Sequence, residues 1–163
     1  MAVVEGARRA RGLRFALVVS RYHDFVTDRL QAGALECLSS AEVAEEDITV
    51  LRVPGAFEIP LAARKAAETG RFSAIICLGC LIKGATSHFE YLASAVSHAV
   101  AAAAADTGVP MTFGVLTTSS IEEALQRAGN GSANKGWEAA MAAVEMATLL
   151  KQFARSTSPG IRV

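Results

Sequence analysis

Residues 74–88 read AIICLGCLIKGATSH, and this stretch decides how the chain folds. The apolar run at its start is typical of a strand that is buried on both faces. Small residues and hydroxyl side chains follow, and a long helical pattern begins after them. A strand that ends in a small-residue turn and opens a helix directs free backbone N–H groups at one place, which favours phosphate binding. The stretch therefore predicts a strand, an anion-binding turn and a helix in direct succession.

Three other apolar runs share the character of this strand. Together they predict four buried strands: Phe15–Val19, Ile48–Val53, Ala74–Leu78 and Thr112–Leu116. Helical patterns separate the runs, and two more helical segments follow the last one. Strands that alternate with helices in this way predict an α/β fold, in which helices cover both faces of a parallel sheet through right-handed crossovers.

Capping residues mark the expected helix ends. Asp24 is placed to N-cap the first helix, and the fixed φ of Pro60 fits the first turn of the second. The Ser119–Ser120 pair can cap a short helix after the fourth strand. A last helix is expected from about Asn134 to Phe153, after a glycine-rich break in the chain.

Composition limits the classes of partner. The chain has 163 residues, 52% of them hydrophobic and 20% charged, with a formal net charge of +0. Such a balance does not predict binding to nucleic acid or to an acidic membrane, and no apolar stretch is long enough to span a bilayer. A mean hydropathy of +0.32 is high for a small soluble protein. We expect the excess apolar surface to be buried against further copies of the chain.

One domain accounts for most of the length. We expect it to cover residues 13–155, with a flexible arm or edge strand at 1–12 and a loose tail at 156–163. The arm carries three arginines without the apolar core of a secretory signal, so a cytoplasmic protein is expected.

The three cysteines are expected to be reduced thiols. Cys77 and Cys80 match a C-x-x-C pattern. On an extended segment this odd spacing sends the two side chains to opposite faces. A redox or zinc-binding pair is therefore not expected.

Ligands of parallel α/β proteins bind beyond the carboxyl ends of the strands. This rule collects the candidate binding loops at one edge of the sheet: Arg21–His23, Pro54–Glu58, Cys80–His88 and Thr117–Thr118. Each candidate has an alternative explanation. Tyr22 either offers a flat face to a heterocycle or is a half-buried aromatic at a strand end. Phe57 is either a site or a core residue, and Glu58 either accepts hydrogen bonds from a polyol or only complements a helix dipole.

The turn at residues 84–88 has the strongest case. Small residues let a phosphate approach the backbone, and Thr86 adds a hydroxyl donor, although Thr86 or Ser87 could simply be an N-cap. His88 can accept and return a proton near neutral pH. Arg127 either pairs with a phosphate or complements the end of its own helix. Lys83 either holds an anion or is a solvated turn residue. A phosphate cradle beside a proton carrier predicts a reaction on a small phosphorylated molecule.

Several of these segments together resemble the lumazine synthase family. The matching text is residues 20–22, 54–60, 79–91, 113–118, 127–129 and 134–136, and the likeness extends in order from about residue 13 to 153. It implies a three-layer αβα, flavodoxin-like fold with a four-stranded parallel sheet in the order 2-1-3-4. It also implies a transferase that condenses 5-amino-6-ribitylaminouracil with 3,4-dihydroxy-2-butanone 4-phosphate. The products are 6,7-dimethyl-8-ribityllumazine, phosphate and water, and no metal or organic cofactor takes part.

The resemblance implies a role for each matching residue. Tyr22 would stack on the pyrimidine, residues Ala56, Phe57 and Glu58 would hold the ribityl chain, and backbone groups of Cys80, Leu81 and Ile82 would bind the uracil. The phosphate would be held by Gly84, Ala85, Thr86, Arg127 and Lys135. His88 would carry protons, and Phe113 would come from the neighbouring subunit.

The resemblance also implies a homopentamer with sites shared between adjacent subunits. In some members of the family twelve pentamers close into an icosahedral shell, and the short Gly129–Ala133 connection is similar to theirs. Two residues depart from the common pattern: Tyr22 adds a hydroxyl to the stacking face, and His23 stands where many members have asparagine. A flavin- or lumazine-binding protein, or a shell protein without catalysis, remains the alternative function.

Overall fold

The computed structural model of the protein describes residues 1–156. Its strands are β1 (Phe15–Ser20), β2 (Ile48–Val53), β3 (Ala74–Ile82) and β4 (Met111–Thr118). The helices are α1 (Asp24–Ser40), α2 (Ile59–Glu68), α3 (His88–Thr107), α4 (Ile121–Arg127) and α5 (Lys135–Ser156). Short 3-10 helices lie at η1 (Glu45–Asp47), η2 (Ala56–Glu58) and η3 (Gly131–Ala133).

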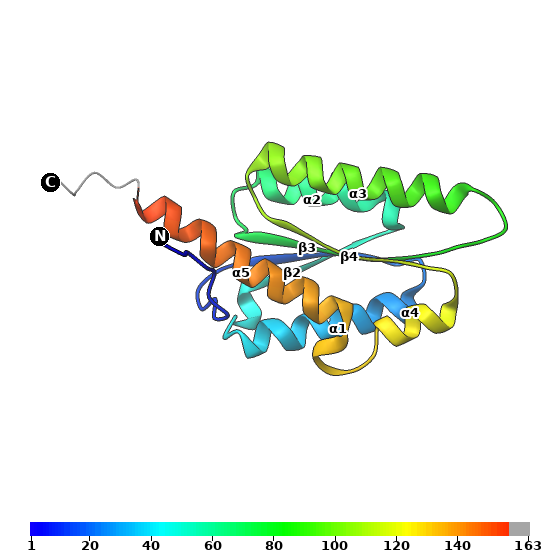
Figure 1. Ribbon diagram of the computed structural model, residues 1–163, viewed down its shortest axis with the longest axis horizontal. Coiled ribbons are helices and arrows are strands. Elements are labelled where there is room, and N and C mark those ends of the chain that lie inside the picture. The colour runs from blue at the N-terminus through cyan, green and yellow to red at the C-terminus, as the bar shows by residue number, and fades with distance from the viewer. Residues whose placement is uncertain (157–163) are drawn as a thin grey trace, which may run out of the picture.

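The four strands form one parallel sheet in the order β2-β1-β3-β4. Helices α2 and α3 cover one face, and α1, α4 and α5 cover the other (Figure 1). The three-layer, flavodoxin-like arrangement expected from the sequence is confirmed.

Two apolar cores lie on the two faces of the sheet. Strand β1 supplies both, because its side chains alternate: Leu17 packs on the α1/α5 side and Val18 on the α2/α3 side. Cys77 and Cys80 likewise belong to opposite cores, and both are free thiols. The expected separation of the C-x-x-C pair is therefore confirmed.

Some element ends differ from the expectation. Strand β3 continues to Ile82 because its last residues pair with β4, Gly79 with Val115 and Ile82 with Thr118. The prediction that Asp24 is an N-cap was wrong. Asp24 is the first helical residue, and His23 occupies the N-cap position in the left-handed conformation, at φ 60° and ψ 47°, without a side-chain capping bond.

Other ends agree with the sequence. Pro60 lies in the first turn of α2, and the Ser120 hydroxyl accepts a hydrogen bond from the Glu123 N–H at the start of α4. Helix α5 continues to Ser156. Residues 157–163, where most of the loose tail is expected, lie outside the described part of the chain.

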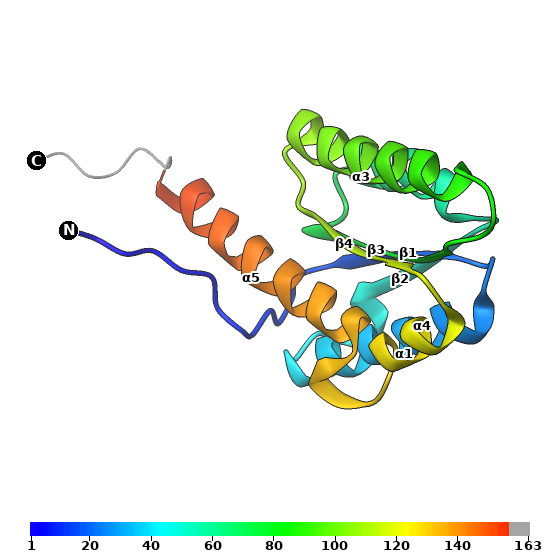
Figure 2. The same ribbon diagram turned by 45° about the vertical axis from the view of Figure 1, so that its right-hand side comes forward.

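The N-terminal segment runs beside the far half of α5, away from the sheet (Figure 2). The Thr148 hydroxyl bridges the two, accepting from the Ala7 N–H at 2.8 Å and donating to the Ala7 carbonyl at 3.0 Å. Arg8 pairs with Glu145 at 3.3 Å. The domain limits proposed at residues 13 and 155 stay a prediction.

Candidate active site

A cavity of about 760 Å³ opens at the carboxyl edge of the sheet, and we call it the strand-edge pocket. The β1–α1 loop, the turn around η2, the end of β3 and the first turns of α3 each contribute a wall. Its lining residues are Tyr22, His23, Gly55, Ala56, Phe57, Glu58, Cys80, Leu81, Ile82, Gly84, Thr86, His88, Phe89, Leu92 and Ile121. The structure thus brings three of the four predicted loops together in one cavity.

Backbone hydrogen bonds fix the first two loops against each other. The Arg21 N–H donates to the Val53 carbonyl at 2.8 Å, and the Tyr22 N–H donates to the Pro54 carbonyl at 3.1 Å. The Tyr22 side chain remains 68% exposed. Its ring meets the His23 ring edge-on, with centroids 4.5 Å apart. An exposed aromatic on a fixed backbone can stack on a flat ligand.

The turn around η2 presents its larger side chains outward. Ala56 is buried, whereas Phe57 is 63% exposed, which excludes a core role for its ring in this chain. Glu58 occupies the N-cap position of α2 and makes no capping hydrogen bond with its side chain. Its carboxylate is therefore available to accept hydrogen bonds from a hydroxylated ligand.

The turn into α3 keeps the features of an anion site. Residues 84–88 are exposed and small or polar, and His88 is the first residue of the helix. Ser87, at the N-cap position, makes no side-chain capping bond. The first N–H groups of a helix have no partner within it, so they can bind an anion. Lys83 pairs with Glu90 at 2.9 Å across this turn, and the pairing lowers the pKa of Glu90.

Two further properties of the pocket concern titration. Burial lowers the pKa of His23, which favours its neutral imidazole. The Cys80 thiol turns into the core beneath the pocket, and burial raises its pKa to about 11. The same cause raises the pKa of Cys77 to about 12. Neither thiol is activated as a nucleophile.

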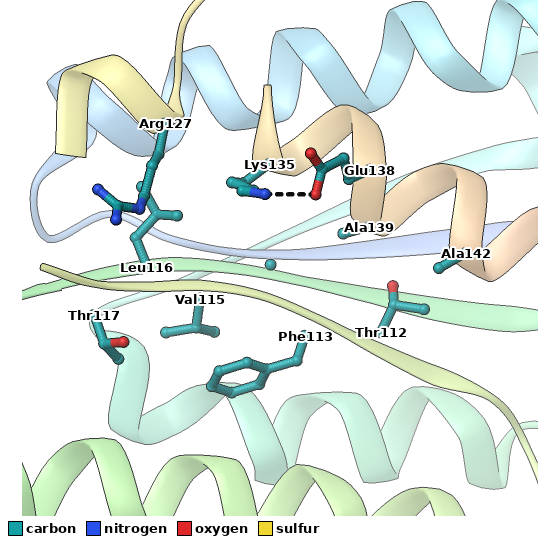
Figure 3. A pocket seen from close by; sticks show the side chains of 11 residues that line it. Thr112, Phe113, Val115, Leu116, Thr117, Arg127, Lys135, Glu138, Ala139 and Ala142 are labelled. Carbon is teal, nitrogen blue, oxygen red and sulfur yellow. Dashed lines mark hydrogen bonds and ion pairs between the residues drawn. The ribbon is translucent and has the colours of Figure 1, made fainter. Parts of the chain in front are cut away.

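Three other predicted residues, Phe113, Arg127 and Lys135, line a different cavity, of about 430 Å³, which we call the β4-edge pocket (Figure 3), whereas Ala85 lines neither cavity. Figure 3 shows Arg127 and Lys135 on one side of β4, the outermost strand, and the Phe113 side chain on its other side. Arg127 lies 3.9 Å from the Glu123 carboxylate, and Lys135 contacts Glu138 at 2.7 Å. Within one chain, therefore, Arg127 and Thr86 line separate cavities. The expectation that Arg127 joins the strand-end loops does not hold inside a single copy.

Sequence reasoning did not assign a site role to several lining residues. Phe89, Leu92 and Ile121 add apolar surface to the strand-edge pocket, and His23 adds a second imidazole. The inward-facing pattern of α3 could have indicated Leu92. Ile121 follows the cap of α4, and nothing in its local pattern indicates a pocket.

The fold and these cavities define a class: a parallel α/β protein that binds small molecules at the carboxyl edge of its sheet. A family model described as 6,7-dimethyl-8-ribityllumazine synthase matches residues 12–151. The chain belongs to this family. Two curated relatives carry the same name. The protein from Syntrophus aciditrophicus (strain SB) is 54% identical over 93% of this chain and 98% of its own length. The protein from Desulfatibacillum aliphaticivorans is 48% identical over 93% of this chain and 97% of its own length.

Along residues 1–156, no helix is both long and apolar enough to cross a membrane.

Proposed function

We propose that this enzyme, a transferase, condenses 5-amino-6-ribitylaminouracil with 3,4-dihydroxy-2-butanone 4-phosphate to give 6,7-dimethyl-8-ribityllumazine, phosphate and water. This condensation is the penultimate step of riboflavin biosynthesis. The match to the family over residues 12–151 carries the proposal. The strand-edge pocket supports it with an aromatic face, an unpaired carboxylate and a helix N-terminus around one cavity.

Each wall of the pocket has a proposed task. Tyr22 stacks on the pyrimidine, and backbone groups of residues 80–82 bind its polar edge. Ala56, Phe57 and Glu58 hold the ribityl chain. The small turn at Gly84, Ala85 and Thr86 cradles the phosphate with its free N–H groups.

The reaction depends on positioning the two substrates and on proton transfer more than on an activated nucleophile. The substrate amine attacks the ketone to form an imine with loss of water, phosphate then leaves, and a second condensation closes the ring. His88 accepts and returns protons beside the cradle. The N–H groups of the cradle stabilise the departing phosphate, and holding both substrates in one cavity supplies much of the rate.

The proposed site is shared between copies. Arg127, Lys135 and Phe113 line the β4-edge pocket of one chain, and we propose that they complete the strand-edge pocket of a neighbour. Phe113 belongs to β4 and is 43% exposed, and within residues 1–156 β4 has no strand partner on its outer side. Bringing both cations to the phosphate this way supplies the charge that the turn itself lacks.

We further propose a homopentamer located in the cytoplasm. The short Gly129–Ala133 connection favours closure of twelve pentamers into a shell, since η3 keeps this turn compact. Light scattering of the purified protein measures the assembly directly, and a monomer would contradict both the pentamer and the shared site.

The direct test is to supply both substrates and follow lumazine fluorescence together with released phosphate. We expect the two products in equal amounts and far above the uncatalysed rate. Binding of riboflavin or lumazine without condensation would instead favour a binding protein.

A further inference from the structure

The side chain of Asn134 is the feature of this chain that the proposed site does not yet use. Asn134 is 2% exposed and lies just before α5. Its Oδ1 accepts hydrogen bonds from the Gly136 N–H at 2.8 Å and the Trp137 N–H at 3.2 Å. Its Nδ2 donates to the Gly129 carbonyl at 2.7 Å and the Arg29 carbonyl at 3.1 Å. The amide therefore uses both donors and both acceptor positions.

These four bonds join three segments. The two accepted bonds cap α5 in the usual manner of an N-cap residue. Capping does not require the two donated bonds, which attach the start of α5 to the turn that follows α4 and to the first half of α1. Only an amide of this length offers two donors and two acceptors at once.

Two glycines, Gly33 and Gly136, allow the close contact between α1 and the start of α5 at this junction. A Cβ on Gly33 would overlap the Asn134 amide, and a Cβ on Gly136 would overlap the Leu30 carbonyl of α1. The close approach of α1 and α5 therefore depends on the absence of both side chains. The junction is a fixed point, not a flexible hinge.

The fixed point lies between the two cations of the β4-edge pocket. Lys135 follows Asn134 directly, and Gly129, whose carbonyl accepts from Asn134, is close in the chain to Arg127. Figure 3 shows Arg127 and Lys135 reaching the pocket from α4 and from the start of α5. Their separation is thus set by the turn that Asn134 fastens.

We propose that Asn134 is a positioning residue for the reaction: it fixes the α4–α5 turn so that Arg127 and Lys135 converge on the phosphate of the substrate. The proposal rests on the proposed function of the β4-edge pocket. Arg127 and Lys135 lie at the two ends of this turn, so a loosened turn lets the two cations shift independently and weakens their joint grip on an anion.

Asn134→Ser is the sharpest variant, because it separates capping from fastening. Serine is an equally good N-cap, but its short hydroxyl cannot also donate to the two carbonyls. We expect the KM for the phosphorylated substrate and the inhibition constant of inorganic phosphate to rise about tenfold, while the KM for the pyrimidine changes less than about twofold. Asn130→Ser is the matched control, since Asn130 is an exposed residue of the same turn.

Gly33→Ala provides a second variant that disturbs the same amide without removing it. A folded, assembled variant of either kind with unchanged phosphate inhibition would overturn the proposal. An equal rise of both KM values would also overturn it, and so would failure of both variants to assemble, which would make Asn134 a purely structural residue. Calorimetric titration of phosphate into the wild-type protein and the variants tests the inference even if no condensation is observed, so its failure is distinct from failure of the proposed function.

Discussion

The strand-edge pocket and the β4-edge pocket of one chain are built for different parts of a ligand. The first has aromatic and aliphatic walls, with the Glu58 carboxylate and two imidazoles among them. The second is backed by small residues of α5 and carries Arg127 and Lys135. The strand-edge pocket has a ring surface and a helix N-terminus for an anion, whereas the cations Arg127 and Lys135 line the other pocket of the same copy. The proposed enzyme therefore needs a neighbour, because neither pocket alone combines the ring surface with these two cations.

The largest expected effect comes from two variants, each of which damages a different pocket, combined as separate chains in one assembly. Arg127→Ala removes a cation, and Thr86→Glu puts a carboxylate into the phosphate cradle. Each variant alone should lose at least tenfold in kcat/KM for the phosphorylated substrate. Coexpressed in equal amounts, the two should recover about a quarter of wild-type activity, because about a quarter of shared sites then combine two unaltered pockets.

A site confined to one chain gives a different result, since every chain in the mixture would carry a damaged site. No recovery on coexpression would therefore refute sharing, provided that mixed oligomers are shown by mass spectrometry. Thr86→Ser, which keeps the hydroxyl, should retain activity and serves as the control for the cradle.

His88→Ala tests the chemical role of the strand-edge pocket. We expect kcat to fall about ten- to a hundredfold with little change in either KM, because proximity of the substrates still supplies much of the rate. His98→Ala in the same helix is the control. His98 is exposed and hydrogen-bonded through Nδ1 to the Ser94 carbonyl at 2.7 Å, outside the pocket. Equal losses in the two variants would remove His88 from the chemistry.

Tyr22→Ala sharpens the division between the two pockets. Loss of the stacking face should raise the KM for the pyrimidine about tenfold and leave the KM for the phosphorylated substrate nearly unchanged, the reverse of the Arg127 variant. Tyr22→Phe keeps the face and should stay within about twofold of wild type. A Tyr22→Ala enzyme with an unchanged pyrimidine KM would show that the ring binds elsewhere.

Much of the fold could be predicted because its rules are local. Apolar runs mark the four strands, and Pro60 and Ser120 mark helix starts. The end of β3 could not be read in this way, since Gly79–Ile82 became strand only through pairing with Val115–Thr118 far along the chain. The left-handed conformation of His23 was missed because Asp24 is the stronger N-cap by residue type.

The candidate site was likewise predictable only in the part that a general rule of parallel sheets determines. The rule for parallel sheets correctly gathered the loops after β1, β2 and β3, because the carboxyl ends of those strands share one edge. Arg127 is the last residue of α4, and the direction in which a short helix leaves the last strand depends on its packing. The order of residues does not determine that direction, so only the three-dimensional structure could show that Arg127 lines a separate cavity at β4.

The smallest expected effect concerns His23, which lines the strand-edge pocket and packs edge-on against Tyr22 and Phe25. Burial lowers its pKa in the folded protein, so below the ordinary value of 6.5 the unfolded chain binds more protons at this position than the folded one. The contribution of His23 to the free energy of unfolding is therefore full at pH 7.5 and is reduced as the pH falls below 6.5.

His23→Asn removes this titration and keeps a residue type that tolerates the left-handed conformation. Urea denaturation at pH 7.5 and 5.5, at one protein concentration, should show a smaller loss of stability on acidification in the variant than in wild type. His98→Asn, which alters an exposed imidazole, should behave as wild type, and an identical pH dependence in all three proteins would mean that the His23 ring is as well solvated as a free one.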